Sequence, residues 1–561
     1  MKEYKYIVAR ALNSYEATSP MTALGIKCLM EQMRSERIRA KLPNILKRKL
    51  EVTNKLSLRD YQILKSKGED GNTYRKVVAP SAFSALMEAE FFRLLPTHNQ
   101  NSKSVFSYRI PTNKDQNFRN FEYYYENYIQ MNKSILSSMI KNKCDSVLII
   151  DLKAFYPSIN TKRAIIDFRK AQPVFDSILN TYDLYQEGLP IGLDLSHLIA
   201  QHYLKGFDQV LTRQFGNRYF RYVDDISIVC NETDKDEITA YIQSNLPEGL
   251  EINPDKLDIA PKATWAGITN QVEERYKLDS FATYLSIYIS FNPEISEIKG
   301  TLEQHNFHLP LYKFSERVKT STFNRFFSLL YKERFRLVSS IFRWSNEDLV
   351  NFLKNRKTYH LEAVNESIVD IVKYEHAKDI TTRFRLQNIK YHLSNLFYLL
   401  DDDELVNLQR RLPEHADLFY FGAIVDALIN HNFDSLFELG GRYVVILAEM
   451  WLTREKESIN LDFSSFMNID NYSESICYLS IVGVLVIDIK SLKVKFENQS
   501  EFKFVSSIIN REELQVTDCE YTNEMQLLFS RYDDIQLKEL LLSKFDKTDD
   551  VSFYALEEGA Y

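Results

Sequence analysis

Hydrophobic and polar positions follow two different patterns along the chain. Between residues 60 and 270, short apolar runs rich in β-branched residues, such as SVLIID and YVDDISIV, alternate with segments that have helical spacing. Short apolar runs bounded by turn residues predict strands, whereas apolar residues at i, i+3 and i+4 predict amphipathic helices. The first half of the chain is therefore predicted to be α+β.

Individual segments of this half can be assigned from the same pattern. Residues 1 to 60 are predicted to be helical, and TYRKVVAPSAFSALMEAEFFRLL to be a strand, a break at Pro80 and a helix. SVLIIDLKAFYPSI predicts a buried strand opening into a turn, and RYFRYVDDISIVC a β-hairpin. QEGLPIGLDLSHLIAQHYLKGFDQVL predicts a Gly/Pro loop and one helix of about five turns. GLEINPDKLDIAPKATWAGI predicts two further short strands.

The second half changes to helical spacing. Three sets of apolar residues each share one helical face: Leu405, Leu408 and Leu412; Ile424 and Leu428; Val444, Leu447 and Trp451. Short loops separate these segments, which favours successive antiparallel helices, in the manner of degenerate helical repeats. The stretch VGVLVIDIKSLKVKF at 482–496 is compatible with a hairpin instead. We expect a helical part at 1–60, an α+β domain at 61–275 and an α-helical domain at 276–561.

Composition is typical of a folded protein with several domains. The 561 residues are 45% hydrophobic and 26% charged, with 15 Gly and 14 Pro, which excludes a disordered chain. The first residues, MKEYKYIVAR, lack a signal-peptide pattern, and no apolar run approaches the roughly 20 residues of a membrane span. Five cysteines are scattered without a CxxC pair, as expected for a reducing cytoplasm and for a chain without a zinc site.

Charge is distributed unevenly. The net charge is −7, but residues 1–270 hold 37 Lys and Arg against 31 Asp and Glu, and residues 271–561 hold 33 against 46. A basic first half joined to an acidic second half indicates that the first half is the part that meets phosphate groups.

Acidic residues stand at the ends of two predicted strands. Asp151 ends the SVLII strand, and Asp224 and Asp225 occupy the turn of the predicted hairpin. Alone, an Asp pair in a turn is more often solvated than bound to metal. If the two strands pair, however, their carboxylates can hold two Mg²⁺ ions about 4 Å apart, the arrangement that activates a hydroxyl and stabilises a leaving pyrophosphate.

The order of these segments resembles a known family. DLKAFYPSI, GLPIGLDLSHLIA, YVDD and LEINPDK resemble motifs A, B, C and D of reverse transcriptases, and YRKVVAP resembles the fingers segment that meets the triphosphate. The resemblance covers roughly residues 60–270 and implies a right-hand-like fingers and palm domain. A viral RNA-dependent RNA polymerase more usually carries GDD in place of the VDD found here.

The resemblance also implies roles for individual residues. Asp151 and Asp224 would ligate two Mg²⁺ ions (Mn²⁺ being the alternative), with help from Asp225 and the Leu152 carbonyl. Arg75 and Lys76 would neutralise the triphosphate. The remaining residues expected to bind nucleotide are Phe155, Tyr156, Gly192 and Lys256. Among these, Tyr156 falls where the family places the ring that excludes a 2′-hydroxyl, Phe155 is preferred as packing, and Lys256 matches a lysine that protonates pyrophosphate.

Four positions of the GLPIG segment and its helix carry further expectations. Gly188 and Gly192 would let the loop flex beneath a new base pair. Ile191 departs from the Gln that retroviral enzymes often carry, so template handling differs from theirs. His197 is interpreted as a packed or capping residue.

A reverse transcriptase core followed by a long helical half resembles bacterial abortive-infection (Abi) reverse transcriptases, which defend against phage. That resemblance implies untemplated DNA synthesis from dNTPs, priming by a hydroxyl of the protein itself, nucleic acid (the DNA product and RNA) as partner, and a homo-oligomer. Tyr4, Tyr6, Tyr15 and Tyr123–Tyr125 are among many tyrosines that could prime. Two alternatives stay open: templated cDNA synthesis on a dedicated noncoding RNA, and a catalytically inactive RNA-binding protein.

Overall fold

The computed structural model describes most of the chain. The described residues are 3–52, 55–66, 72–95, 103–112, 118–171, 176–185, 188–277, 281–292, 294–314, 335–373, 380–463, 472–497, 499–510 and 517–543. Within them, no helix combines the length and the apolar character that crossing a membrane requires.

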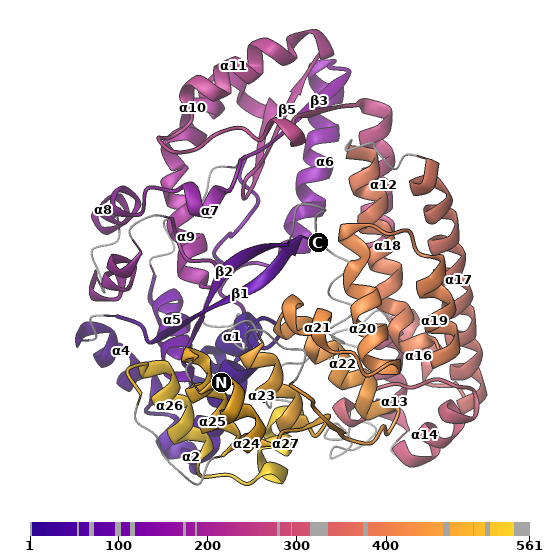
Figure 1. Cartoon of the computed structure of the whole chain (residues 1–561). Helices are drawn as coiled ribbons and strands as arrows, with labels where there is room; N and C mark the ends of the chain where they lie inside the picture. Colours follow the sequence, from indigo (N-terminus) through magenta and orange to yellow (C-terminus); the bar gives the residue numbers. More distant parts are fainter. Residues whose placement is uncertain are drawn as a thin grey trace.

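A four-stranded antiparallel sheet lies at the centre of the first half (Figure 1). Its strands stand in the order β4-β5-β3-β6, with bounds Tyr219–Tyr222, Asp225–Cys230, Ser146–Asp151 and Asp258–Pro261. The predicted hairpin is confirmed, because β4 and β5 pair across a turn formed by Val223 and Asp224. The predicted strand SVLIID is β3, buried along its whole length between β5 and β6.

Successive residues of β3 enter two different cores, because side chains alternate across a strand. Val147 and Ile149 pack with helices α6 (Tyr124–Asn142) and α12 (Lys262–Lys277). Leu148 and Ile150 belong to the main core on the opposite face. Helices α8 to α11 belong to this second side; their bounds are Thr161–Ala171, Asp194–Tyr203, Lys205–Phe215 and Lys235–Asn245. The sheet is therefore covered on both faces.

A separate two-stranded ribbon projects beside this sheet. Strands β1 (Leu58–Ser66) and β2 (Thr73–Pro80) pair in antiparallel register, and α5 (Ala82–Leu94) follows, as predicted. Four helices precede the ribbon: α1 (Glu3–Tyr15), α2 (Pro20–Gln32), α3 (Glu36–Arg39) and α4 (Leu42–Val52). Loop 188–192 lies against β2, where the Val78 N–H donates to the Ile191 carbonyl over 2.8 Å.

Two predictions for this half were wrong in detail. The single helix expected after GLPIG is split at Leu204 into α9 and α10, just before Gly206, a residue of low helix propensity. Of the two strands expected in 249–268, β6 alone forms in the described residues, with one isolated bridge between Leu152 and Ile252. Pro254 has no N–H with which to extend that bridge, and KATWAGI begins α12.

The second half is helical, as its spacing predicted. Its first helices are α13 (Phe281–Phe291), α14 (Ile295–Gln304), α16 (Phe335–Ile341), α17 (Asn346–Lys373) and α18 (Ile380–Leu399). Next come α19 (Asp402–Arg411), α20 (Phe419–Ile429), α21 (Asp434–Leu439) and α22 (Gly441–Thr453), which carry the predicted apolar faces. The last are α23 (Ser473–Val482), α24 (Ile489–Phe496), α25 (Ser500–Ile509), α26 (Glu520–Phe529) and α27 (Asp534–Leu542).

The hairpin interpretation of 482–496 was wrong. The two-residue strand β8 (Leu485–Val486) pairs in parallel with β7 (Ile459–Asn460), and helix α24 follows at once. The Asp488 side chain starts this helix by accepting hydrogen bonds from the N–H groups of Lys490 and Ser491.

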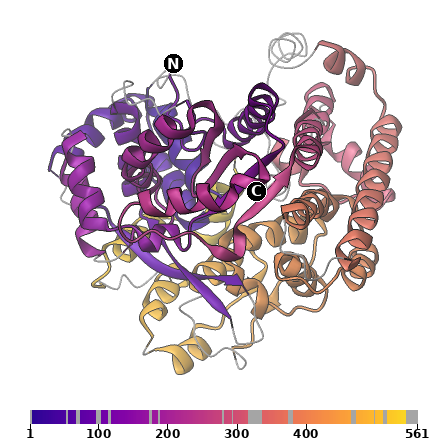
Figure 2. The ribbon, with the colours of Figure 1, turned by 90° about the horizontal axis from the view of Figure 1, so that it is seen from above.

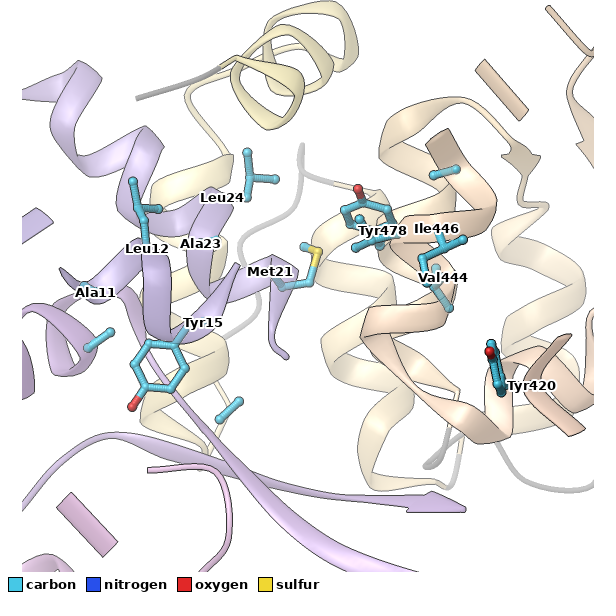
Figure 3. Packing of buried hydrophobic residues seen from close by; sticks show 14 of the residues in the cluster. Ala11, Leu12, Tyr15, Met21, Ala23, Leu24, Tyr420, Val444, Ile446 and Tyr478 are labelled. Carbon is cyan, nitrogen blue, oxygen red and sulfur yellow. The ribbon is translucent and has the colours of Figure 1, made fainter. Parts of the chain in front are cut away.

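The two halves share one main hydrophobic core. It runs from Tyr4 in α1 to Leu537 in α27. Figure 3 shows where they meet: Met21 of α2 points toward Tyr478 of α23 and the helix that carries Val444 and Ile446. In Figure 2, the helices of the second half flank the first half along one side.

Candidate active site

Three carboxylates come together where β3 and β5 end. Asp151 is the last residue of β3 and stands opposite Asp225, the first residue of β5, while Asp224 lies in the turn before it. Val223 has a φ of 55°, a left-handed conformation that is unusual for a β-branched residue and marks a strained turn. The pairing predicted from sequence therefore occurs, and it brings the three acids to one edge of the sheet.

Electrostatic repulsion is strong in this group. Enclosure by protein and, second, the negative charge of Asp151 together raise the pKa of Asp224 to about 6. The same enclosure, together with Asp224 and Asp151, raises the pKa of Asp225 to about 7, although this side chain is open to solvent in the cleft. Like charges held this close favour either protonation or a bound cation.

Positive groups partly compensate this charge. The ammonium of Lys256 lies 3.0 Å from Oδ1 of Asp151, and the Asn253 side-chain amide donates to Oδ2 over 3.0 Å. The backbone N–H of Asn253 donates to the Asp151 carbonyl over 2.8 Å, so the turn containing Pro254 lies against the end of β3. Lys256 was predicted to act here. Asn253 was not, although an Asn before Pro-Asp is a recognisable turn signal.

The donor set fits a hard divalent cation by its chemistry, since it consists of carboxylate oxygens. In the described part of the chain, however, no three His, Cys, Asp or Glu side chains are grouped closely enough to hold a metal ion. Lys256 and Asn253 engage both carboxylate oxygens of Asp151. Metal ligation by Asp151 would require at least one of these contacts to open.

Strand β2 contributes basic residues to the same cleft. The positive charge of Arg75 acts on Asp224 and partly opposes the rise in its pKa. Lys76 lies 2.7 Å from a carboxylate oxygen of Asp60 on β1, and its ammonium lies 5.9 Å from the centre of the Tyr185 ring. Both predicted residues line the cleft, but Lys76 is paired with an acid while Arg75 faces the acidic group.

The glycines of the GLPIG loop allow backbones to approach closely. A Cβ on Gly188 would lie 2.6 Å from the Pro157 Cα, and one on Gly192 would lie 2.2 Å from the Val78 carbonyl oxygen. Both glycines have positive φ, of 75° and 119°. Gly188 lines the cleft, but Gly192 is not among its lining residues and lies against β2 instead.

Leu152, Phe155 and Tyr156, which follow Asp151, all line the cleft but differ in burial. Leu152 and Phe155 are buried, with 1% and 4% exposure. Tyr156 is half-buried and lines the cleft, and its hydroxyl lies 2.5 Å from Nδ1 of His197. The prediction of packing for Phe155 agrees with its burial. The expectation that His197 merely packs or caps missed its contact with Tyr156.

These groups line one cleft of about 1000 Å³ between the ribbon, the sheet and α9. The acids, Arg75 and Lys76, and the rings of Tyr108, Tyr156 and His197 all line this cleft. Such a cleft can hold a phosphorylated ligand, with cationic groups beside the phosphates and an aromatic wall beside a sugar or base.

Comparison with known families agrees with this geometry. Residues 65–270 match the family described as Reverse transcriptase (RNA-dependent DNA polymerase). Residues 65–270 form a reverse transcriptase domain. The chain is accordingly an enzyme of the reverse transcriptase type, a nucleotidyltransferase. No curated protein is similar enough to this chain to count as a relative.

The reverse transcriptase domain contains every site residue predicted from the sequence. It begins in β1, so the ribbon with Arg75 and Lys76 is included, and it ends in α12, after Lys256. As a polymerase domain of this type it implies nucleotides and nucleic acid as ligands, and a divalent metal as cofactor. The individual roles of the residues stay predictions.

Proposed function

We propose that the chain is a DNA polymerase whose catalytic group is Asp151, Asp224 and Asp225. The observation that carries this proposal is the pairing of Asp151 with Asp225, which brings three carboxylates to one sheet edge facing Arg75. In this proposal the four-stranded sheet with α6 and α12 is the palm, and the β1–β2 ribbon with the first helices belongs to the fingers. Residues 276–561 form, in this proposal, an α-helical domain of degenerate repeats that shares the main core with the first half.

Two Mg²⁺ ions, or Mn²⁺, are the proposed cofactors. Asp151, Asp224, Asp225 and the Leu152 carbonyl would hold them. When bound, the ions supply activation of an attacking hydroxyl and neutralisation of pyrophosphate. Lys256, which contacts Asp151, would leave that carboxylate and act on the pyrophosphate as a proton donor.

The proposed nucleotide site uses the walls of the cleft. Arg75 would contact the triphosphate directly, and Lys76 would do so after exchanging its contact with Asp60. Tyr156 would lie beneath the sugar and exclude a 2′-hydroxyl, with Phe155 packed behind it. Gly192 would act indirectly, by letting the GLPIG loop lie close to β2.

We further propose a role in abortive-infection defence against phage, with untemplated DNA synthesis from a protein hydroxyl, in a cytoplasmic homo-oligomer. The support is the long helical second half, whose net acidic charge disfavours a nucleic-acid duplex along it. Among the tyrosines considered as primers, Tyr4, Tyr6, Tyr15 and Tyr125 are buried. Tyr124 lines the cleft, which makes it the best placed of that set.

The test is incubation of the purified chain with Mg²⁺ and single dNTPs, with and without nuclease treatment. We expect DNA in both samples, and DNA that stays attached to protein after denaturation. DNA that appears in the untreated sample alone would support templated synthesis on a noncoding RNA.

Matched variants test the catalytic assignment. Asp224→Asn should abolish DNA synthesis, whereas Asp236→Asn on exposed α11 should leave it unchanged. If Asp224→Asn keeps full defence activity in cells, the result would support the remaining alternative, a catalytically inactive polymerase-like protein that binds RNA.

A further inference from the structure

Three rings that line the cleft form a connected group. The Tyr108 and His197 rings are stacked, with centroids 4.3 Å apart and planes at 8°. The Tyr156 ring stands nearly perpendicular to His197, with centroids 5.3 Å apart and planes at 71°. The Tyr156 hydroxyl lies 2.5 Å from Nδ1 of His197 and 3.4 Å from the Tyr108 hydroxyl. All three residues line the cleft.

The backbone beneath Tyr156 gives its ring little support of its own. Tyr156 lies in α7 (Phe155–Ser158), a helix of four residues preceded by Ala154 at a φ of 46°. A tyrosine side chain on a single helical turn retains rotameric freedom unless its ring or hydroxyl is held. The hydroxyl contact with His197 therefore fixes the far end of the ring, while Phe155 contacts it edge-on near the backbone.

The two partners of Tyr156 are themselves firmly placed. His197 is the fourth residue of α9. The first residue of this helix, Asp194, anchors it by accepting hydrogen bonds from the Ser14 hydroxyl over 2.5 Å and from the Asn120 amide over 2.8 Å. Burial lowers the pKa of His197 to about 4, so the ring is neutral at pH 7 and its Nδ1 shares a hydrogen bond with the Tyr156 hydroxyl.

Tyr108 is tied to the strand that leads to the acids. Its segment lies alongside β4, where Phe106 N–H donates to the Arg221 carbonyl, and the Val223 N–H donates to the Ser107 hydroxyl over 2.9 Å. Tyr108 has a φ of 46°, a strained conformation for a bulky residue that packing must maintain. The aromatic group thus has a defined position relative to the turn that carries Asp224.

We propose that His197 and Tyr108 are positioning residues that hold the Tyr156 ring in place and thereby set the preference of the enzyme for deoxyribonucleotides over ribonucleotides. The inference rests on the proposed function of Tyr156 as the ring beneath the sugar. Excluding one hydroxyl sterically requires a wall that does not move by the size of that hydroxyl. A ring released from His197 can turn aside and admit the 2′-hydroxyl.

The test compares dATP and ATP as substrates of the full-length protein. The selectivity is the ratio of the two kcat/KM values. We expect His197→Ala to lower this ratio about tenfold, which corresponds to the loss of one hydrogen bond worth about 1.4 kcal/mol. Tyr156→Phe, which keeps the ring and removes the hydroxyl, should lower it equally. The double variant should fall no further than either single variant, because both remove the same contact.

Three further variants distinguish positioning from general stability. His197→Asn places a polar group near the position of Nδ1 and should retain most of the selectivity. Tyr108→Ala removes the stacked ring and should lower the ratio, while Tyr156→Ala removes the wall and should lower it most. A variant that merely destabilises the fold would lower both kcat/KM values together and leave their ratio unchanged.

Binding of dATP and ATP is also measured by equilibrium titration with Ca²⁺ in place of Mg²⁺. If wild-type protein incorporates neither nucleotide, the proposed polymerase function fails, and the binding ratio still decides this inference. The inference is overturned if wild-type protein shows no preference in either assay. It is also overturned if His197→Ala keeps the wild-type ratio while Tyr156→Ala loses it.

Discussion

At the scale of single residues, the site is an excess of negative charge with a few cations placed around it. Lys256 contacts Asp151 directly, and the charges of Arg75 and Arg383 reach Asp224 and Asp225 respectively. Buried carboxylates without such partners are costly. Lys256 therefore has a structural role in the metal-free protein that is separate from its proposed catalytic one.

Lys256→Met should make this role measurable. Without divalent metal, the variant should lose about 1 kcal/mol of unfolding free energy, a modest value because the lysine is half exposed. With saturating Mg²⁺ the loss should shrink, since a bound cation supplies the missing charge. Thermal unfolding in EDTA and in Mg²⁺ measures both effects. Lys262→Met, at an exposed lysine that begins α12, is the control; equal stability of the two variants in EDTA would contradict the prediction.

The same residues show how far the sequence could predict the site. Asp151, Asp224 and Asp225 could be placed together because two β-branched runs predicted strands, and strand ends bring their side chains together. Asn253 and Tyr108 could not be assigned in this way. Asn253 contacts Asp151 from 102 positions further along the chain, and Tyr108 meets Tyr156 across 48 positions. Periodicity within a segment carries no information about such contacts between loops.

At the scale of elements, the predictions held where hydrophobic periodicity was strong and failed where single residues decide. The strands β3 and β5 and the helices α19, α20 and α22 follow from repeated apolar positions. The break at Leu204 and the start of α24 depend on single residues, Gly206 and the cap Asp488. Such local signals compete with an otherwise continuous pattern, and packing settles the outcome.

Gly192 should be intolerant of substitution because it joins two elements of the site. In Gly192→Ala, the new Cβ would lie 2.2 Å from the Val78 carbonyl, at a φ of 119° that L residues rarely adopt. The loop must then move away from β2, so we expect a loss of about 2 kcal/mol in stability and a larger loss of polymerase activity. Chemical denaturation and dNTP incorporation measure the two effects.

Gly267→Ala is the matched control for that change. Gly267 lies exposed in the middle of α12, and a Cβ there would have no neighbouring atom within 4 Å. Alanine should stabilise the helix by about 0.5–1 kcal/mol and leave activity unchanged. If Gly192→Ala behaves in the same way as Gly267→Ala, the close approach of the loop to β2 is needed neither for stability nor for polymerase activity.

At the scale of the whole molecule, the helical half is joined to the reverse transcriptase domain in several places. The Asn72 amide and the Tyr74 hydroxyl donate to Glu438 of α21, which contacts the ribbon near its free end. On the other side, the Ile380 N–H at the start of α18 donates to Asp258 of β6 over 2.6 Å. Helix α2 is enclosed by both halves, and nearly all of its residues are buried.

Among these connections, we expect the loss of one buried ionic group to lower the free energy of unfolding most. Arg59 of β1 is 3% exposed; its Nε lies 2.8 Å from Glu501 of α25, and a terminal nitrogen lies 3.3 Å from Glu474 of α23. Glu474 also accepts from the Ser19 hydroxyl before α2. Arg59→Met would leave the buried carboxylate of Glu474 and the partly buried one of Glu501 without their cation, so we expect a loss of about 3–5 kcal/mol in unfolding free energy.

Calorimetry tests whether this ionic group stabilises both halves of the protein together or one half alone. Because the core is continuous, wild-type protein should unfold in one transition, and Arg59→Met should lower the temperature of that transition for both halves together. The triple change Arg59→Met, Glu474→Gln and Glu501→Gln removes the uncompensated charge and should recover most of the loss. A second, unshifted transition assignable to the reverse transcriptase domain would show instead that the domain folds independently of the helices packed on it.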